Sequence, residues 1–395
     1  MKIARITLPL AFFAFILIGA NDGAVGVLLP SMRGFYQVDK ATIGFLFLAG
    51  ALGYLLASFN QGLLIEQLGN RLFLVVGASV FILGAGTLSL RPVFPVALVA
   101  VMLIGGGGAA LDAGLNAYIA GLPRNASLLN YLHAFYGIGA LIGPALASLI
   151  LAASWTWNSV YIIWVSVGMV ALVGFWFVFR EPAFDENKKA AKEPGNVLAL
   201  ALRLRVVWIG ALFLLFYVGS EVSLGSWSYT FLTEQRHLPT LFSGWAVSGY
   251  WFGLTVGRLT LARLAERGGG KRLIQGCLVG VAVGIVLIWF APDGAVAAAG
   301  LWIAGFSLGP IFPTTIAIMS TLVPSRLLPS AIGFLASLGS MGAALFPWLA
   351  GNLAQQFGLW TLLPYIVVLS GVMLVLWLAL RGRPAIAPSP EVKGS

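Results

Sequence analysis

The chain contains twelve apolar runs, each long enough to cross a lipid bilayer as a helix. The hydrocarbon core of a bilayer is about 30 Å thick and needs roughly 20 mainly apolar residues per helix. The runs lie near 6–31, 41–65, 72–90, 94–121, 127–153, 158–179, 206–232, 241–265, 272–291, 295–320, 327–354 and 357–380. The sequence therefore predicts an all-α polytopic membrane protein with twelve transmembrane helices.

Composition excludes the common soluble classes. The chain is 59% hydrophobic and only 9% charged, whereas a soluble globular protein carries about 25% charged residues. Its two histidines and its single cysteine, Cys277, offer little material for a metal site or for a nucleophile with its base. We therefore expect no enzyme, no metal site and no cofactor.

The net charge of +10 follows from membrane topology. If the amino terminus is cytoplasmic, only Arg33, Lys40, Arg91 and Arg236 of the 23 Lys and Arg residues lie outside, and nineteen lie inside. Cytoplasmic loops carry such an excess. We expect a monomeric multi-pass protein of the cell inner membrane with both termini in the cytoplasm. Its expected partners are lipid, protons and a small sugar-like substrate, and not nucleic acid. The apolar start of the chain continues past Asp22 to Pro30, which predicts a retained first helix and not a cleaved signal peptide.

The two halves of the chain match at an offset of about 200 residues. The acid–acid match of Glu66 with Glu266 is the most specific, because the chain has only 13 acidic residues. Glycines and one basic pair follow the same offset: Gly44 and Gly244, Gly53 and Gly253, Arg71 and Lys271, Gly105 and Gly305, Gly139 and Gly339. Two repeats with a binding site at their interface are typical of transporters. The predicted organisation is a six-helix bundle over 1–180, a cytoplasmic loop over 181–204, a second bundle over 205–383 and a disordered tail over 384–395.

The loop after the second predicted helix carries a family motif. It contains Gly62-x3-Glu66-x2-Gly69-Asn70-Arg71, which resembles the Gly-x3-Asp-x2-Gly-Arg loop of the major facilitator superfamily. A degenerate copy surrounds Glu266. The resemblance covers the whole chain except the tail and implies two pseudo-symmetric six-helix bundles. It also implies that Gly62, Glu66, Gly69, Arg71 and Glu266 form cytoplasmic gating loops; a basic turn without a switching role is the alternative.

Three further stretches are similar to the fucose:proton symporter branch of this superfamily. They are Leu28–Pro30, Leu111–Asn116 and Leu129–Phe135. The resemblance implies that Asp112 and Asn116 take part in proton coupling and cargo binding. Counted back from Pro30, the acid of the first helix in that branch falls at Gly26, one turn after Asp22.

Asp22, Asp112 and Glu221 lie deep inside predicted apolar helices. A charged acid at a helix centre costs about 2.5–3.5 kcal/mol on insertion scales. The sequence places no Lys or Arg at the middle of a helix, since Arg258 is counted near an inner end. Each acid must then be protonated, pair with a cation or face a water-filled cavity. We expect Asp112 and Asp22 to couple transport to protons and Glu221 to bind cargo; interhelical hydrogen bonding is the alternative for each.

Further polar and aromatic residues are candidates for binding a sugar-like cargo. Amide and imidazole groups pair with hydroxyls, and indole rings stack on the apolar face of a sugar. The candidates are Asn116, Asn130, His133, Trp227 and Trp251. Each of them also suits ordinary helix packing.

The function expected from these residues is proton-coupled symport of a monosaccharide or similar small solute by alternating access. The alternative is a proton-driven efflux antiporter of drugs or small metabolites. Gly139-x3-Gly143-Pro144 partly matches the antiporter motif, but the Arg of proton-antiporting drug pumps would fall at Met102. A receptor or scaffold with a transporter fold also stays open.

Overall fold

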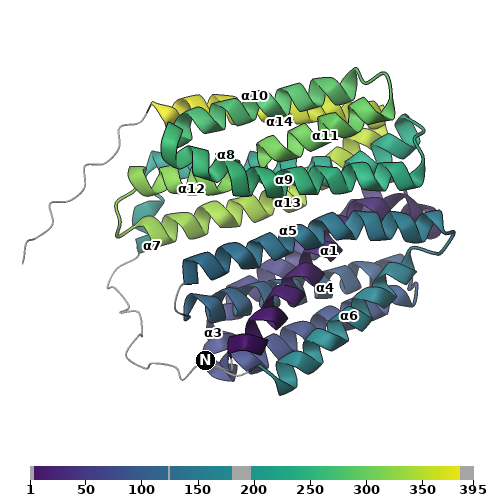
Figure 1. Cartoon of the computed structure of the whole chain (residues 1–395), viewed down its shortest axis with the longest axis horizontal. Coiled ribbons are helices and arrows are strands. Elements are labelled where there is room, and N and C mark those ends of the chain that lie inside the picture. Colours follow the sequence, from purple (N-terminus) through teal and green to yellow (C-terminus); the bar gives the residue numbers. More distant parts are fainter. Residues whose placement is uncertain (1–3, 123–124, 180–196, 383–395) are drawn as a thin grey trace, which may run out of the picture.

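The computed structural model describes residues 4–122, 125–179 and 197–382, apart from the side chains of 4–6, 125–126 and 262–268. All regular structure within these ranges is helical. The helices of the first half are α1 (Ala4–Tyr36), α2 (Lys40–Ile43), α3 (Phe45–Ser89), α4 (Phe94–Ala120), α5 (Asn125–Ala152) and α6 (Asn158–Phe177). Together they form one of the two bundles in Figure 1.

The second half forms the other bundle (Figure 1). It contains α7 (Val197–Ala201), α8 (Arg205–Thr230), the π-helix η2 (Phe231–Gln235), α9 (Thr240–Gly268), α10 (Gly270–Trp289), α11 (Gly294–Leu308), α12 (Ile311–Leu322), α13 (Leu328–Phe357), the 3-10 turn η3 (Leu359–Thr361) and α14 (Leu362–Arg381). Helix α7 lies in the predicted central loop 181–204. The rest of that loop up to 196, and the predicted tail 384–395, lie outside the described residues.

Twelve helical crossings make up the two bundles. Ten stretches of the described chain are long and apolar enough to cross a membrane. One of them, Lys40–Ser89, contains two limbs that meet at Gly69. Helix α9 is less apolar and is not among the ten, but at 29 residues it is long enough to span. The predicted architecture of two six-helix bundles is confirmed.

The repeat is visible in the backbone. Gly69 has φ 74° and Gly269 has φ 86°, and each lies between two consecutive spanning limbs. Only glycine adopts this left-handed conformation without strain. Two residues 200 positions apart therefore make the same sharp change of direction.

Equivalent glycines also bring equivalent helices together. A Cβ on Gly53 of α3 would lie 1.8 Å from the carbonyl oxygen of Met102 in α4. A Cβ on Gly253 of α9 would lie 2.5 Å from the carbonyl oxygen of Trp302 in α11. Small residues let helices pack backbone to backbone in membrane proteins, so both halves use the same close crossing.

The halves meet along α1 and α8, α5 and α9, and α13 against α2 and α3. We call the side that holds Ala4 and Arg381 the terminal side, and the opposite side the distal side; they lie at the left and right of Figure 1. Toward the distal side, a Cβ on Gly26 would lie 2.6 Å from the carbonyl oxygen of Ser226, and a Cβ on Gly244 would lie 2.1 Å from the Cβ of Ser148. The two halves are therefore tightly apposed on the distal side.

Candidate functional site

Asp22 lies midway along α1 and accepts two hydrogen bonds. The Tyr136 hydroxyl of α5 donates to Oδ2 at 2.9 Å, and the Asn21 amide donates to Oδ1 at 3.2 Å. Asn21 is buried, whereas Asp22 is exposed. The carboxylate is thus fixed in orientation and still accessible in the middle of a spanning helix.

Asp112 of α4 has a similar set of donors. The Tyr54 hydroxyl of α3 donates to Oδ2 at 3.2 Å. The Asn116 amide donates to Oδ1 at 2.8 Å and to the backbone oxygen of Asp112 at 2.9 Å. The structure therefore brings together Asp112 and Asn116, and it turns the Asn116 amide toward the acid.

The two acids of the first half lie close enough to repel each other electrostatically. Tyr54 interacts with both of them. We call Asp22 and Asp112 the acid pair. Their like charges make the ionisation of one acid less favourable when the other is ionised.

Glu221 of α8 lies beside a cation, and this corrects the expectation that the buried acids have none. Arg258 of α9 interacts electrostatically with Glu221, and the Tyr217 hydroxyl lies close to both. The Arg258 Nε donates to the carbonyl oxygen of Gly309 at 3.3 Å. The placement of Arg258 at an inner helix end is therefore wrong: ten residues separate it from the end of α9.

Tyr136 connects the acids of the two halves. Its hydroxyl binds Asp22, and it also interacts electrostatically with Glu221 and Arg258. Its neighbour Gly137 lies against α9, where a Cβ would be 2.4 Å from the Thr255 hydroxyl. The candidate site thus lies at the interface of the halves, where α1, α5, α8 and α9 meet.

Asn130 and His133 of α5 are both exposed. The His133 ring packs edge-on against Phe15 with centroids 5.7 Å apart. Across the interface it interacts electrostatically with Arg258. Both residues lie nearer the terminal side than Tyr136. This stretch of α5 is therefore accessible, whereas the distal end of α5 is packed against the other half.

The two predicted tryptophans differ in their surroundings. Trp227 is 1% exposed, and its indole N–H donates to the carbonyl oxygen of Pro347 at 2.8 Å. This is the arrangement of a packing residue. Trp251 is 7% exposed and packs against Gly225, one turn from Glu221. Its indole nitrogen is buried and has no hydrogen-bond partner within the described part of the chain, so both tryptophans are packed in the core and only Trp227 has its N–H bonded.

The predicted gating loop is a kinked helix in the structure. Gly62 and Glu66 are exposed on the first limb of α3, and Gly69 makes the kink. Arg71 donates to the carbonyl oxygen of Trp176 near the end of α6 and lies over the Trp176 ring. The motif's basic residue therefore contacts its own half.

The second copy of the loop behaves in the same way. Lys271, the equivalent of Arg71, donates to the carbonyl oxygen of Arg381 at the end of α14, 2.7 Å away. The side chain of Glu266 lies outside the described residues. In both halves a basic residue after the glycine thus contacts the C-terminal end of the last helix.

The sequence did not single out four residues of this site: Tyr54, Tyr136, Tyr217 and Arg258. Tyrosines in apolar helices are typical of packing as well, and they gave no distinguishing signal. Arg258 did give a signal, because the equivalent position of the first half, 200 residues earlier, is the uncharged Ser58. A cation that breaks the repeat inside a spanning helix is a functional candidate.

The described side chains of the site are hydrogen-bonding and titratable groups. Carboxylates and phenol hydroxyls are present on both sides of the interface, and the amides belong to the first half. The described residues contain no group of three or more His, Cys, Asp or Glu side chains that could hold a metal ion.

Comparison with known proteins identifies the family. The model of the Major Facilitator Superfamily matches residues 11–244 and 228–394. Three relatives are each 25% identical: Bypass of stop codon protein 6 of Saccharomyces cerevisiae, over 92% of this chain and 79% of that protein; a glucose/galactose transporter of Brucella abortus, over 90% and 89%; and the multidrug efflux pump Tap of Mycolicibacterium fortuitum, over 89% and 90%.

Solved structures share the fold. A bacterial homologue of the lysosomal transporter Spinster, in an inward-facing and occupied conformation, has a TM-score of 0.80 at 14% identity, covering 98% of this chain and 100% of that one. The Escherichia coli fucose:proton symporter in its outward conformation has a TM-score of 0.64 at 16% identity, covering 96% and 99%. The resemblance inferred from the motifs is confirmed. The chain belongs to the major facilitator superfamily and is a multi-pass membrane transporter, not an enzyme.

Proposed function

We propose that the chain imports a monosaccharide or a similar small polar solute together with protons, by alternating access. The observation that carries this proposal is the acid pair of the first half. Asp22 and Asp112 each accept hydrogen bonds from a tyrosine and an asparagine, and Asp22 is accessible. A carboxylate in this setting exchanges a proton with water on one side and releases it on the other after the halves have moved.

Asp112 and Asp22 are the proposed proton carriers. Within the described residues neither forms an ion pair, so neutralisation by a proton removes the cost of a bare charge in the membrane. Glu221 differs because Arg258 lies beside it. This contrast supports a coupling role for the acid pair and a binding role for Glu221.

The proposed cargo site contains Glu221, Asn116, Asn130, His133 and Trp251. These side chains offer donors and acceptors for hydroxyl groups, and one aromatic face. The printed function of the Brucella abortus relative, glucose/galactose transport, fits such a cargo. We leave Trp227 out of the proposed site, because its N–H is already bonded to the carbonyl oxygen of Pro347.

We further propose that the terminal side faces the cytoplasm and that the structure represents a state open toward it. The close contacts between the halves on the distal side support this. So does the higher TM-score to an inward-facing structure, 0.80, than to an outward one, 0.64. In the opposite state, Glu66, Arg71 and Glu266 would form the cytoplasmic contacts that the family motif implies.

Proton-driven efflux is a second candidate function. The acid pair presents negative charge without an ion pair in the described chain, which would suit a cationic compound. The relative from Mycolicibacterium fortuitum is a multidrug efflux pump. Symport and antiport make opposite predictions for the direction in which protons move.

The two functions are separated by following protons in proteoliposomes. Purified protein is reconstituted with a pH dye inside, and no gradient is imposed. Sugars and then cationic drugs are added outside, with protein-free liposomes as the control. Inward sugar–proton symport acidifies the lumen when one sugar is added, whereas drug–proton antiport makes it more alkaline when a drug is added. Alkalinisation with drugs and silence with every sugar would refute the symport proposal.

A further inference from the structure

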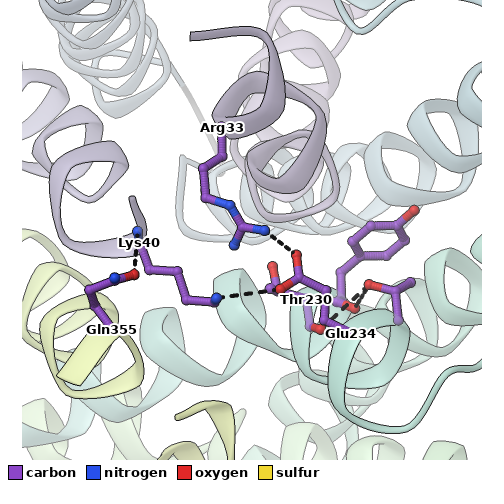
Figure 2. Close-up of polar contacts among 7 residues, drawn as sticks. Arg33, Lys40, Thr230, Glu234 and Gln355 are labelled. Carbon is purple, nitrogen blue, oxygen red and sulfur yellow. Dashed lines mark hydrogen bonds and ion pairs between the residues drawn. The ribbon is translucent and has the colours of Figure 1, made fainter. Parts of the chain in front are cut away.

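A single carboxylate of the second half contacts two cations of the first half on the distal side. Figure 2 shows Glu234 between Arg33 and Lys40: Arg33 Nη2 lies 2.7 Å from Oε1, and Lys40 Nζ lies 3.5 Å from Oε2. Their side chains are 27%, 22% and 20% exposed. Each carboxylate oxygen thus holds one cation, and all three side chains are exposed enough for salt in the surrounding water to screen the contacts.

Glu234 is firmly attached to its own half. It lies on the π-helix η2, which continues α8. Arg236, just after η2, donates to the carbonyl oxygens of Ile288 at 2.8 Å and Trp289 at 2.6 Å, at the end of α10. π-Helical turns are rare and are frequently found at functional sites. The acid therefore lies between helix α8, which precedes it, and the side-chain contacts of Arg236, which follow it.

Lys40 is positioned by contacts within the first half and also contacts the second half. It begins α2, and the Asp39 side chain caps that helix by accepting from the Thr42 N–H at 2.7 Å. The backbone N–H of Lys40 donates to the Gln355 side-chain oxygen of α13 at 3.1 Å (Figure 2). A Cβ on Gly351 would lie 2.7 Å from the Lys40 carbonyl oxygen. The α2 region thus rests directly on α13.

We propose that Glu234 is the electrostatic clamp of the distal side. Opening this side separates α1 and α2 from α8 and α13, and Glu234 must then release both Arg33 and Lys40. The arrangement is asymmetric: without either cation one ion pair remains, but without Glu234 two cations of the first half face the second half unbalanced. Neutralising Glu234 therefore favours the state that is open on the distal side.

The opening can be measured with the substitution Ser148→Cys, which introduces a cysteine between the two halves. Ser148 of α5 is fully buried against Gly244 of α9, near the distal end, and Ser148→Cys adds little volume. The native cysteine is removed by Cys277→Ser. The exposed Ala153→Cys, just beyond α5 on the same side, identifies vesicles in which the distal side faces out. The measured quantity is the rate of reaction with a membrane-impermeant maleimide added outside.

Glu234→Gln in the Ser148→Cys background is expected to raise the labelling rate about 3- to 10-fold, the range set by losing one or two partly buried ion pairs. Arg33→Gln and Lys40→Gln raise it less. The matched control is Arg91→Gln, because Arg91 lies on the same side but stacks on Phe35 of its own half at 4.3 Å; its rate stays that of the parent. An unchanged rate in Glu234→Gln, or parent labelling as fast as at Ala153→Cys, overturns the proposal.

Salt provides a second test, whose decisive result needs only the parent Ser148→Cys protein with Glu234 intact. Raising the ionic strength from 0.1 to 1 M shortens the Debye length from about 10 to 3 Å, so the parent Ser148→Cys rate rises while the Glu234→Gln rate does not. A parent rate that does not respond to salt overturns the clamp. No cargo enters these measurements, so their failure leaves the proposed transport function untouched, and failure of that function leaves the clamp in place.

Discussion

Arg258 and Glu221 are expected to stabilise each other, so that removing Arg258 alone should cost more stability than removing both residues. They form no direct ion pair, but they interact inside the second half with the Tyr217 hydroxyl close to both. Two unit charges about 5 Å apart attract by about 3 kcal/mol at an effective dielectric constant of about 20. Removing one partner of a buried pair costs about 3–5 kcal/mol, because the other charge is left uncompensated.

The test is a double-mutant cycle. Arg258→Gln is expected to be destabilising by about 3 kcal/mol, and Arg258→Gln with Glu221→Gln to recover about 2 kcal/mol of that loss. The exposed Arg203→Gln is the matched control. Because large membrane proteins unfold irreversibly, the assay ranks variants by the temperature at which detergent-solubilised protein loses its monodisperse peak in size-exclusion chromatography. A double variant that is less stable than Arg258→Gln would refute the reasoning.

Three further predictions follow from residues described above. Asp112→Asn is expected to abolish proton-driven accumulation of cargo but to leave counterflow exchange. The control variant Asp293→Asn, on a helix cap away from the site, is expected to keep both activities. Accumulation of cargo by Asp112→Asn would show that Asp112 does not couple transport to protons. Gly53→Ala places a Cβ 1.8 Å from a backbone oxygen and is expected to lower stability by about 1–3 kcal/mol. Gly62→Ala, whose Cβ would have nothing within 4 Å, is expected to keep or improve heat stability. Equal losses of heat stability in the two variants would contradict the close helix crossing at Gly53. The hydrogen bond from Thr42 lowers the pKa of Asp39, so its stabilising contribution is full above the unfolded pKa of about 3.9 and is lost as pH falls through the lower folded value. The difference in heat stability between Asp39→Ala and the parent should therefore shrink below about pH 4, and a constant difference between pH 7 and pH 3 would contradict it.

The fold was predictable because membrane helices carry a strong signal. Apolar runs of 20 or more residues leave few alternatives in a bilayer, and the 200-residue offset predicted the two bundles. Helix boundaries were less predictable. The runs 41–65 and 72–90 correspond to two helical limbs separated by Gly69, whose φ and ψ are not helical, but both limbs reach closer to Gly69 than the predicted runs do. The run 295–320 is two helices, since Pro310 interrupts the hydrogen bonding between α11 and α12.

Of the residues in the site, only the acidic ones could be predicted from the sequence with a clear physical reason. Asp22, Asp112 and Glu221 stand out because charge is rare in apolar helices. Their tyrosine partners do not stand out, and a contact such as Tyr136 with Asp22, 114 residues apart, depends on how two helices are rotated. The position of Arg258 was misjudged because residue counting gives neither the tilt of α9 nor the reach of a long side chain.

Arg71 and Lys271 each contact the C-terminal end of the last helix of their own half. A basic group suits that end, since the helix dipole leaves it negative. Each half is thus closed on itself by a residue at the start of its own third span. A chain cut between the halves should therefore yield two pieces that fold separately and reassemble in one membrane.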